Sequence, residues 1–157
     1  MANEPSLHIP YLYNYAGQPW KTQKRIRTLL NQWFRNDLMG VPGDEDGGGM
    51  SAFVVFSMMG FYPVTPGSPT YNIGSPVFSN VKIDLGNGNV FEIVADKVSN
   101  RNKYIQAARL DGTPLNQSWF EHSQIVSGGV LELKMGAKAN KEWGLGTPPP
   151  SVGLLSE

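Results

Sequence analysis

Residues 81–95, VKIDLGNGNVFEIVA, decide the fold class of the second half of this chain. The first five alternate between apolar and charged side chains, and a period of two is typical of a β-strand with one buried face. The dipeptide Asn87-Gly88 predicts a two-residue hairpin turn of type I′, a turn in which both positions take positive φ. Residues 90–95 are therefore expected to form the returning strand.

Further strands are predicted beyond this hairpin. Residues 103–110 form the third strand, which an Asp-Gly pair ends, and residues 130–135 form another strand after a pair of glycines. Residues 118–126 are open to more than one reading, of which we favour a strand at 118–120 followed by a helical turn. Together these segments predict an antiparallel sheet with one buried face.

The first third of the chain is helical by its periodicity. After Pro19, apolar residues recur with the spacing of one helix face, at Ile26, Leu29, Leu30, Trp33 and Phe34. The basic residues of the segment fall largely off this face and are expected to point into water: Lys21, Lys24, Arg25 and Arg27. This segment is therefore predicted to be an amphipathic helix with one buried stripe.

A second helix is predicted over residues 50–59, which are apolar nearly all round and end at Gly60. A helix of this composition is expected to be buried on most of its surface. The fold class is therefore α+β. We expect helices within residues 1–70, an antiparallel β region over 71–144 and a flexible Gly/Pro/Ser-rich tail over 145–157.

Composition limits the classes of function. The 157 residues contain 13 basic and 13 acidic side chains, and a formal net charge of zero argues against a nucleic-acid partner. The absence of cysteine excludes disulfides and thiolate chemistry. The longest apolar stretch, residues 52–59, is too short for membrane insertion, and the first residues do not resemble a signal peptide.

Three consecutive acids, Asp44, Glu45 and Asp46, lie between glycines and lead into the second helix. One interpretation is a solvated acidic turn. A calcium EF-hand is disfavoured, because position 12 of its loop would be Val55 in place of a glutamate. The remaining interpretation is catalytic, since two carboxylates held by flexible residues can orient a water and remove its proton.

A second candidate constellation stands at the start of the chain. Asn3 and Glu4 offer an amide and a carboxylate oxygen, which suit a hard cation such as calcium, although, taken alone, capping by Asn3 and a solvent-facing Glu4 are the favoured interpretation. His8 is followed by an apolar residue and, judged alone, fits a hydrogen-bonded core histidine. Aromatic residues crowd around this motif, and they serve either core packing or stacking on sugars.

At these residues the chain resembles a known family. The stretches NEPSLHIPYLYNYAG (3–17), GDEDGGGMSAF (43–53), GFYP (60–63) and YNIGSP (71–76) are similar, in this order, to the C-terminal part of glycoside hydrolase family 92. That family contains calcium-dependent, inverting, exo-acting α-mannosidases. The similarity continues to about Trp143 and covers nearly the whole chain.

The resemblance implies a fold and a function. Residues 1–70 would supply the last helices of an (α/α)₆ barrel, and the following residues would form a terminal β-sheet or sandwich unit. The chain would belong to an enzyme that hydrolyses mannose-containing glycans outside the cytoplasm.

The resemblance also implies roles for individual residues. Asp46 would be the general base and Asp44 would assist it, while Asn3 and Glu4 would bind calcium. His8 would be a substrate-binding residue. Leu7 and Gly49 depart from the residues that the family often carries at these two positions.

One part of the expected machinery is absent from the sequence. The general acid of the family is a glutamate in a motif upstream of the NEPS stretch, and this chain does not contain that motif. We therefore expect the chain to be a portion of a longer enzyme and to be inactive alone. The alternatives are a non-catalytic carbohydrate-binding or interaction module, and an oligomer that covers the open barrel face.

Overall fold

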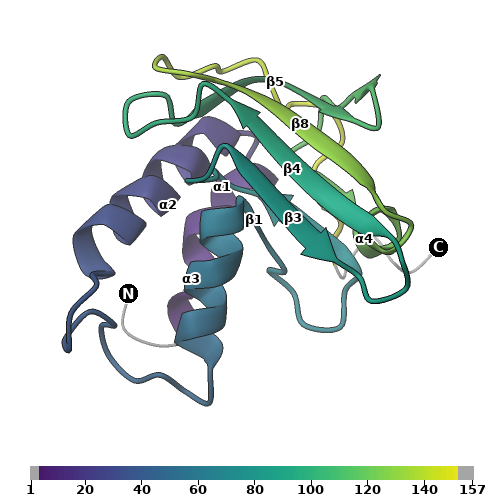
Figure 1. Ribbon diagram of the computed structural model, residues 1–157. Coiled ribbons are helices and arrows are strands. Elements are labelled where there is room, and N and C mark those ends of the chain that lie inside the picture. The colour runs from purple at the N-terminus through teal and green to yellow at the C-terminus, as the bar shows by residue number, and fades with distance from the viewer. Residues whose placement is uncertain (1–3, 152–157) are drawn as a thin grey trace.

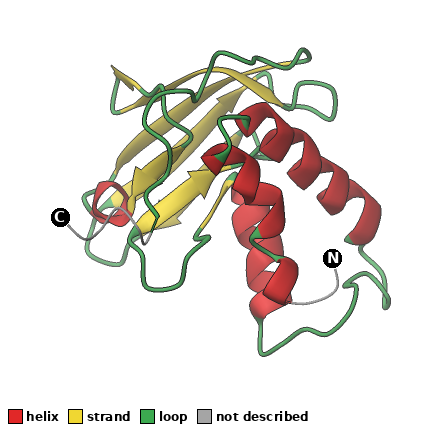
Figure 2. Cartoon of the chain, turned by 180° about the vertical axis from the view of Figure 1, so that it is seen from behind, coloured by secondary structure: helices red, strands yellow, loops and turns green. Residues whose placement is uncertain are grey.

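The computed structural model describes residues 4–151 (Figure 1). The long helices occupy one side of the molecule and the sheets the other, as the view from behind also shows (Figure 2). The helical side contains two 3₁₀ turns and three helices: η1 (Glu4–Ser6), η2 (Ile9–Tyr11), α1 (Leu12–Tyr15), α2 (Pro19–Trp33) and α3 (Gly49–Met59). The predicted α+β class and both long helices are confirmed.

The β side consists of two sheets. The first has the strand order β1-β2-β7, with β1 at Phe61–Tyr62, β2 at Thr70–Ile73 and β7 at Trp119–Glu121. The second has the order β3-β4-β8-β5-β6, formed by β3 (Asn80–Asp84), β4 (Val90–Asp96), β8 (Gly129–Gly136), β5 (Tyr104–Leu110) and β6 (Thr113–Pro114). A short helix, α4 (His122–Val126), follows β7, as the favoured reading of this segment predicts.

The prediction of a purely antiparallel sheet is wrong at one pairing. Strand β8 inserts between β4 and β5, and it runs antiparallel to β5 but parallel to β4. The alternation of apolar and polar residues along a strand determines which side chains face the core. Whether two paired strands run parallel or antiparallel depends instead on the path of the chain that connects them.

The β3–β4 hairpin forms as expected, but its turn differs from the prediction. The loop spans residues 85–89, with Leu85 N–H donating to the Asn89 carbonyl, and the glycines at 86 and 88 have φ of 71° and 87°. Asn87 does not take the positive φ that a type I′ turn needs. The chain therefore reverses direction through a five-residue loop, in which one glycine on each side of Asn87 takes the positive φ.

Each side of the molecule has its own apolar cluster. On the β side, Phe61, Phe91 and Phe120 are fully buried and pack edge-to-face or stacked. On the helical side, Leu7 and Tyr11 join α2 and α3 in a second cluster. Buried polar links hold the two sides together, because Asn14 Nδ2 donates to the Ile73 and Ser118 carbonyls, and Gln23 Oε1 accepts the Ile105 N–H.

Arg27 corrects the expectation that the basic residues of α2 all face water. Its side chain is only 2 % exposed. The guanidinium donates to the Pro76 and Ser99 carbonyls and to Asn100 Oδ1. These loops from the β side pack over one turn of α2, which the periodicity of a single helix does not reveal.

One further expectation, about the burial of α3, differs from the structure. Helix α3 is not buried on most of its surface, since Met50, Phe53 and Ser57 are buried but Val55 is 56 % exposed. Leu145 forms a β-bridge with Gln117, and the Thr147 carbonyl accepts the Trp119 indole N–H, while the flexibility expected of residues 145–157 stays a prediction. Residues 152–157 lie outside the described part. Within residues 4–151, no helix has both the length and the apolar content to cross a bilayer.

Candidate functional site

The acidic loop immediately precedes α3, and its three carboxylates are exposed. Asp46 takes the left-handed conformation, with φ of 55°, and glycines follow it with positive φ at 47 and 48. The Met50 N–H donates to the Glu45 carbonyl at 3.1 Å and the Gly49 N–H to the Asp46 carbonyl at 3.2 Å. The chain therefore turns sharply at Asp46 before the helix begins, which explains why glycines surround it.

Glu45 differs from its two acidic neighbours. Its Oε2 accepts the Gly48 N–H and its Oε1 accepts the Ser51 N–H, both at 3.0 Å. Hydrogen bonding, chiefly from Ser51, lowers the pKa of Glu45 below its ordinary value. Glu45 thus caps the amino-terminal end of α3. The side chains of Asp44 and Asp46 do not take part in this cap.

The capping role of Glu45 is a feature that our sequence reasoning missed. A glutamate three residues before Gly48 and six before Ser51 was the available signal. The sequence interpretation gives roles to Asp44 and Asp46 and none to Glu45, whose two oxygens accept hydrogen bonds at the helix end in the structure. The separation of roles within the loop depends on backbone geometry at the helix end.

The first motif lies beside α3 and shares its apolar cluster. Leu7 and Tyr11 are buried with Met50 and Phe53, so the segment that contains His8 is joined to the helix that follows the acidic loop (Figure 1). The Tyr11 hydroxyl and Ser57 Oγ are hydrogen-bonded at 3.0 Å, and burial raises the pKa of Tyr11. Two motifs that are far apart in sequence thus belong to one structural unit.

The individual residues of the first motif are described unevenly. His8 is half-buried, and its carbonyl accepts the Tyr11 N–H at 2.9 Å. Glu4 begins η1, but its side chain is not described, and Asn3 lies outside the described residues. The structure therefore leaves the predicted roles of Asn3, Glu4 and His8 as predictions.

The implied calcium site can be compared with the acidic and histidine side chains that the structure describes. Among residues 4–151, no three histidine, aspartate or glutamate side chains gather closely enough to hold a metal ion. Calcium requires six to eight oxygen ligands. The described side chains alone therefore do not fit a complete calcium site.

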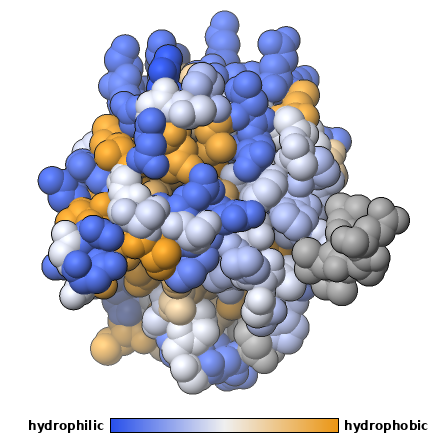
Figure 3. Space-filling model, turned by 90° about the vertical axis from the view of Figure 1, so that its right-hand side faces the viewer, coloured by the Kyte–Doolittle hydropathy of each residue, from blue (hydrophilic) through white to orange (hydrophobic). Residues whose placement is uncertain are grey.

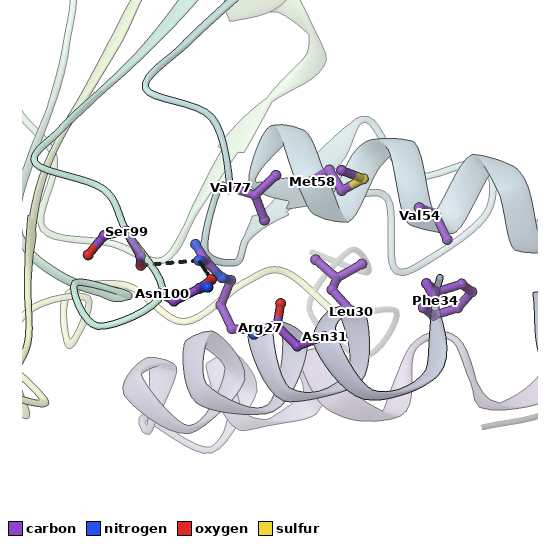
Figure 4. A pocket seen from close by; sticks show the side chains of 9 residues that line it. All are labelled: Arg27, Leu30, Asn31, Phe34, Val54, Met58, Val77, Ser99 and Asn100. Atoms are coloured by element: carbon purple, nitrogen blue, oxygen red, sulfur yellow. Dashed lines mark hydrogen bonds between the residues drawn. The ribbon is translucent and has the colours of Figure 1, made fainter. Parts of the chain in front are cut away.

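Two adjoining hollows lie along α3, the first facing α2 and the second facing the segment that follows α2. The first, about 480 Å³, has Arg27, Leu30, Phe34 and Met58 among its lining residues (Figure 4). The second, about 420 Å³, shares Phe34, Val54 and Met58 with the first and extends to Val41 and Ser51 at the acidic loop. We call this continuous depression the α2–α3 groove.

Comparison with known proteins gives the chain a family. Residues 1–137 match the model of the "glycosyl hydrolase family 92 catalytic domain". The chain belongs to glycosyl hydrolase family 92. The expectation drawn from the NEPS and GDEDGGG motifs is thereby confirmed.

Individual relatives match nearly all of the chain. A curated relative, an uncharacterized secreted glycosidase of Arthroderma benhamiae, is 39 % identical over 98 % of the chain but only 20 % of its own length. A family 92 α-mannosidase from Bacteroides thetaiotaomicron, solved with mannoimidazole, is 37 % identical with a TM-score of 0.92, over 96 % of this chain and 20 % of its own.

An inverting family 92 mannosidase from Bacteroides thetaiotaomicron VPI-5482 is similar as well. It is 41 % identical with a TM-score of 0.86, over 92 % of this chain and 20 % of its own. The chain thus spans about a fifth of the length of these relatives.

Proposed function

We propose that this chain is the C-terminal portion of an inverting exo-α-mannosidase and that it supplies the general base. Its family membership, together with its similarity to solved α-mannosidases, supports the glycosidase class. The name of the Arthroderma benhamiae relative supports action outside the cytoplasm. The assignment of the base rests on a difference in hydrogen bonding within the acidic loop. Glu45 accepts hydrogen bonds from the amides at the start of α3, whereas Asp44 and Asp46 do not.

In this proposal Asp46 accepts a proton from the water that attacks the anomeric carbon of mannose. Asp44 orients that water or stabilises the protonated form of its neighbour. The glycines after Asp46 allow the backbone to approach a sugar ring closely, since they carry no side chains. In an inverting glycosidase, the carboxyl groups of the base and the acid stand roughly 6.5–9.5 Å apart to admit the water.

The general acid and the rest of the metal site belong to other parts of the enzyme in this proposal. Asn3 and Glu4 remain the candidate calcium ligands of this chain. Calcium would position the hydroxyls of the bound mannose. Because protonation of the leaving group needs a donor from elsewhere, the 157-residue chain alone is expected to have negligible α-mannosidase activity.

The test is a chimeric enzyme in which this chain replaces the matching fifth of the inverting Bacteroides thetaiotaomicron mannosidase. Asp46→Asn should lower kcat for an α-mannoside by about 10²–10⁴-fold, because the amide cannot accept the proton from water. Asp96→Asn, at an exposed aspartate on the end of β4, is the matched control and should retain activity.

Two outcomes would count against the proposal. Full turnover in the Asp44→Asn, Asp46→Asn double variant would remove the base assignment. Saturable binding of mannose by the chain, combined with an inactive chimera that is correctly folded, would favour the non-catalytic carbohydrate-binding module instead.

A further inference from the structure

Residues 5–36 carry a positive charge that the neutral composition of the whole chain conceals. This stretch contains five basic side chains and no acidic one, although the chain has 13 of each. Four of the five belong to α2, which has no acidic residue in its first turn. Cations at the start of a helix lie close to the positive end of its dipole, so an anion bound there relieves an unfavourable arrangement.

Three of these cations line one hollow at the start of α2. The hollow has a volume of about 330 Å³, and α1 contributes to its wall. Its lining residues are Tyr13, Trp20, Lys21, Lys24, Arg25 and Thr28. They include no aspartate or glutamate, and none of them lines the α2–α3 groove. We call this feature the basic hollow.

The cations of the basic hollow have no anionic partner among the described residues. The two ion pairs seen within residues 4–151 lie elsewhere, one in the segment after α2 and one between β3 and β4. Lys24 and Arg25 are exposed, and their side chains make no hydrogen bond within the described part of the chain. Their charge is therefore available to a ligand.

Aromatic rings restrict the remaining cation of the hollow. Lys21 Nζ lies 5.6 Å from the centre of the Tyr13 ring and 5.4 Å from that of the Trp20 ring. Lys141 Nζ lies 5.6 Å from the centre of the same Trp20 ring, which adds a further positive charge beside the hollow. A cation–π contact orients an ammonium group without neutralising it, because the ring has no net charge. The positive charge is thus in place before a ligand binds.

A phosphate group matches these donors better than a carboxylate does. A phosphate monoester has a charge of about −1.5 to −2 at pH 7 and three acceptor oxygens, whereas a carboxylate has one charge on two oxygens. Two ammonium groups and a guanidinium supply the opposite charge and enough donors for all three oxygens. The volume of the hollow is near the lower end of the range for small-molecule sites, which suits one group of the size of a sugar.

We propose that the basic hollow binds a phosphate group carried on a sugar of the glycan that the enzyme hydrolyses. The sugar as carrier rests on the proposed function, whereas the preference for phosphate rests on the hollow itself. The hollow and the acidic loop lie at opposite ends of the helical side (Figure 1). The phosphate is thereby kept away from Asp44 and Asp46, whose negative charges would repel it.

Nucleic acid is another common source of phosphate groups, but it fits this chain less well. A nucleic-acid site follows the backbone and neutralises many phosphates along it. The basic hollow is instead one compact cluster on a chain without net charge. The observations therefore favour a single phosphate on a small carrier.

The experiment titrates the ¹⁵N-labelled 157-residue chain with mannose 6-phosphate and follows the indole N–H signals of its tryptophans. We expect a saturable shift of the Trp20 signal, which Trp20→Phe identifies, because Trp20 lines the hollow. The Trp143 signal should stay in place, since this indole is buried and donates to the Leu115 carbonyl. Mannose should leave the Trp20 signal unchanged, and added salt should weaken the binding of mannose 6-phosphate.

Variants locate the site. The double variant Lys24→Gln, Arg25→Gln should weaken the binding of mannose 6-phosphate by about five- to tenfold, because two charged donors are lost. Its matched control is Lys134→Gln, Arg109→Gln, which removes the same two kinds of charge from exposed positions on β8 and β5. The control should bind as tightly as the unsubstituted chain.

Other ligands test the carrier of the phosphate. Inorganic phosphate should bind more weakly than mannose 6-phosphate, because it makes no contact through a sugar. Equal affinities for the two would overturn the assignment of a sugar phosphate. A single-stranded DNA oligonucleotide that binds more tightly than mannose 6-phosphate, and that the Lys24→Gln, Arg25→Gln variant no longer binds, would overturn it in favour of nucleic acid.

The remaining outcomes separate this proposal from the proposed function. A Trp20 signal that does not move, or equal affinity in the Lys24→Gln, Arg25→Gln variant, would overturn the phosphate site even if the chimeric enzyme hydrolyses mannosides. Binding of mannose 6-phosphate that this variant weakens would uphold the site even if the folded chimera is inactive, and the inactivity would then count against the enzyme alone.

Discussion

The β side and the helical side of this molecule use apolar residues in different ways. The β side encloses its aromatic residues between two sheets, and the view from the right of Figure 1 shows polar surface with several apolar areas (Figure 3). Single exposed apolar side chains occur on both sides, since Phe78 and Val90 on the β side are about as exposed as Trp33, but the helical side also has the open α2–α3 groove with its apolar lining. The comparison teaches that the β side completes its own core, whereas the helices carry apolar surface that they do not cover themselves.

The contrast has its origin in how each side buries a face. Alternating strands put every second residue into the same core, so a few sheets close around it. A helix that is apolar nearly all round, like α3, needs neighbours on several sides. Here α2, β1 and the first motif cover part of it, and Phe56 also stacks on Tyr71 of β2.

The largest expected effect comes from removing a buried ring on the β side. Phe120 is fully buried and contacts the rings of Phe61, Tyr71 and Phe91. Phe120→Ala should therefore lower the free energy of unfolding by about 4–5 kcal/mol, measured by urea titration. On the helical side, Phe53 is equally buried, but it lies in the cluster beside the open groove.

Phe53→Ala sharpens this comparison because the surroundings of Phe53 can relax into the groove. Its cost should be nearer 3 kcal/mol, the lower end of the range for such truncations. Equal costs for Phe53→Ala and Phe120→Ala would break the comparison between an open and a closed core.

A smaller effect is expected at the junction between the two sides. Gly60 ends α3 with φ of 107°, and a Cβ there would lie 2.9 Å from the Pro76 ring. Gly60→Ala should cost about 2 kcal/mol through backbone strain and the clash. Gly47→Ala is the control, since Gly47 also has positive φ, but no atom lies within 4 Å of its added Cβ, and its cost should be about half. Thermal unfolding of the two variants measures the difference.

The smallest effect is a pH dependence on the helical side. Because hydrogen bonds lower the pKa of Glu45 in the folded state, its stabilising contribution is present above the unfolded pKa of about 4.3 and is lost as pH falls through the folded pKa. Glu45→Gln should therefore melt below the unsubstituted chain at pH 6, and the gap should close as the pH approaches 3. A gap of constant size across this range would contradict the capping role of the carboxylate.

Local pattern was sufficient for most elements. The start of α2 at Pro19, the end of α3 at Gly60 and the β3–β4 hairpin follow from propensities that act over a few residues. The candidate site was also found in the sequence, because carboxylates between glycines in an otherwise weakly charged chain stand out. The different role of Glu45 was not found, since it depends on where its two oxygens meet the amides of Gly48 and Ser51.

By itself, the sequence determined the family, the helices and strands, and the placement of the acidic loop before an apolar helix. Those features depend on residue order and short-range periodicity. Only the tertiary structure decided that β8 runs parallel to β4, that Arg27 is buried and donates to neutral acceptors, and that α2 and α3 leave a groove between them. These features depend on which distant segments of the chain come into contact. The burial of a side chain and the compensation of its charge are set by that contact and not by the sequence of one segment.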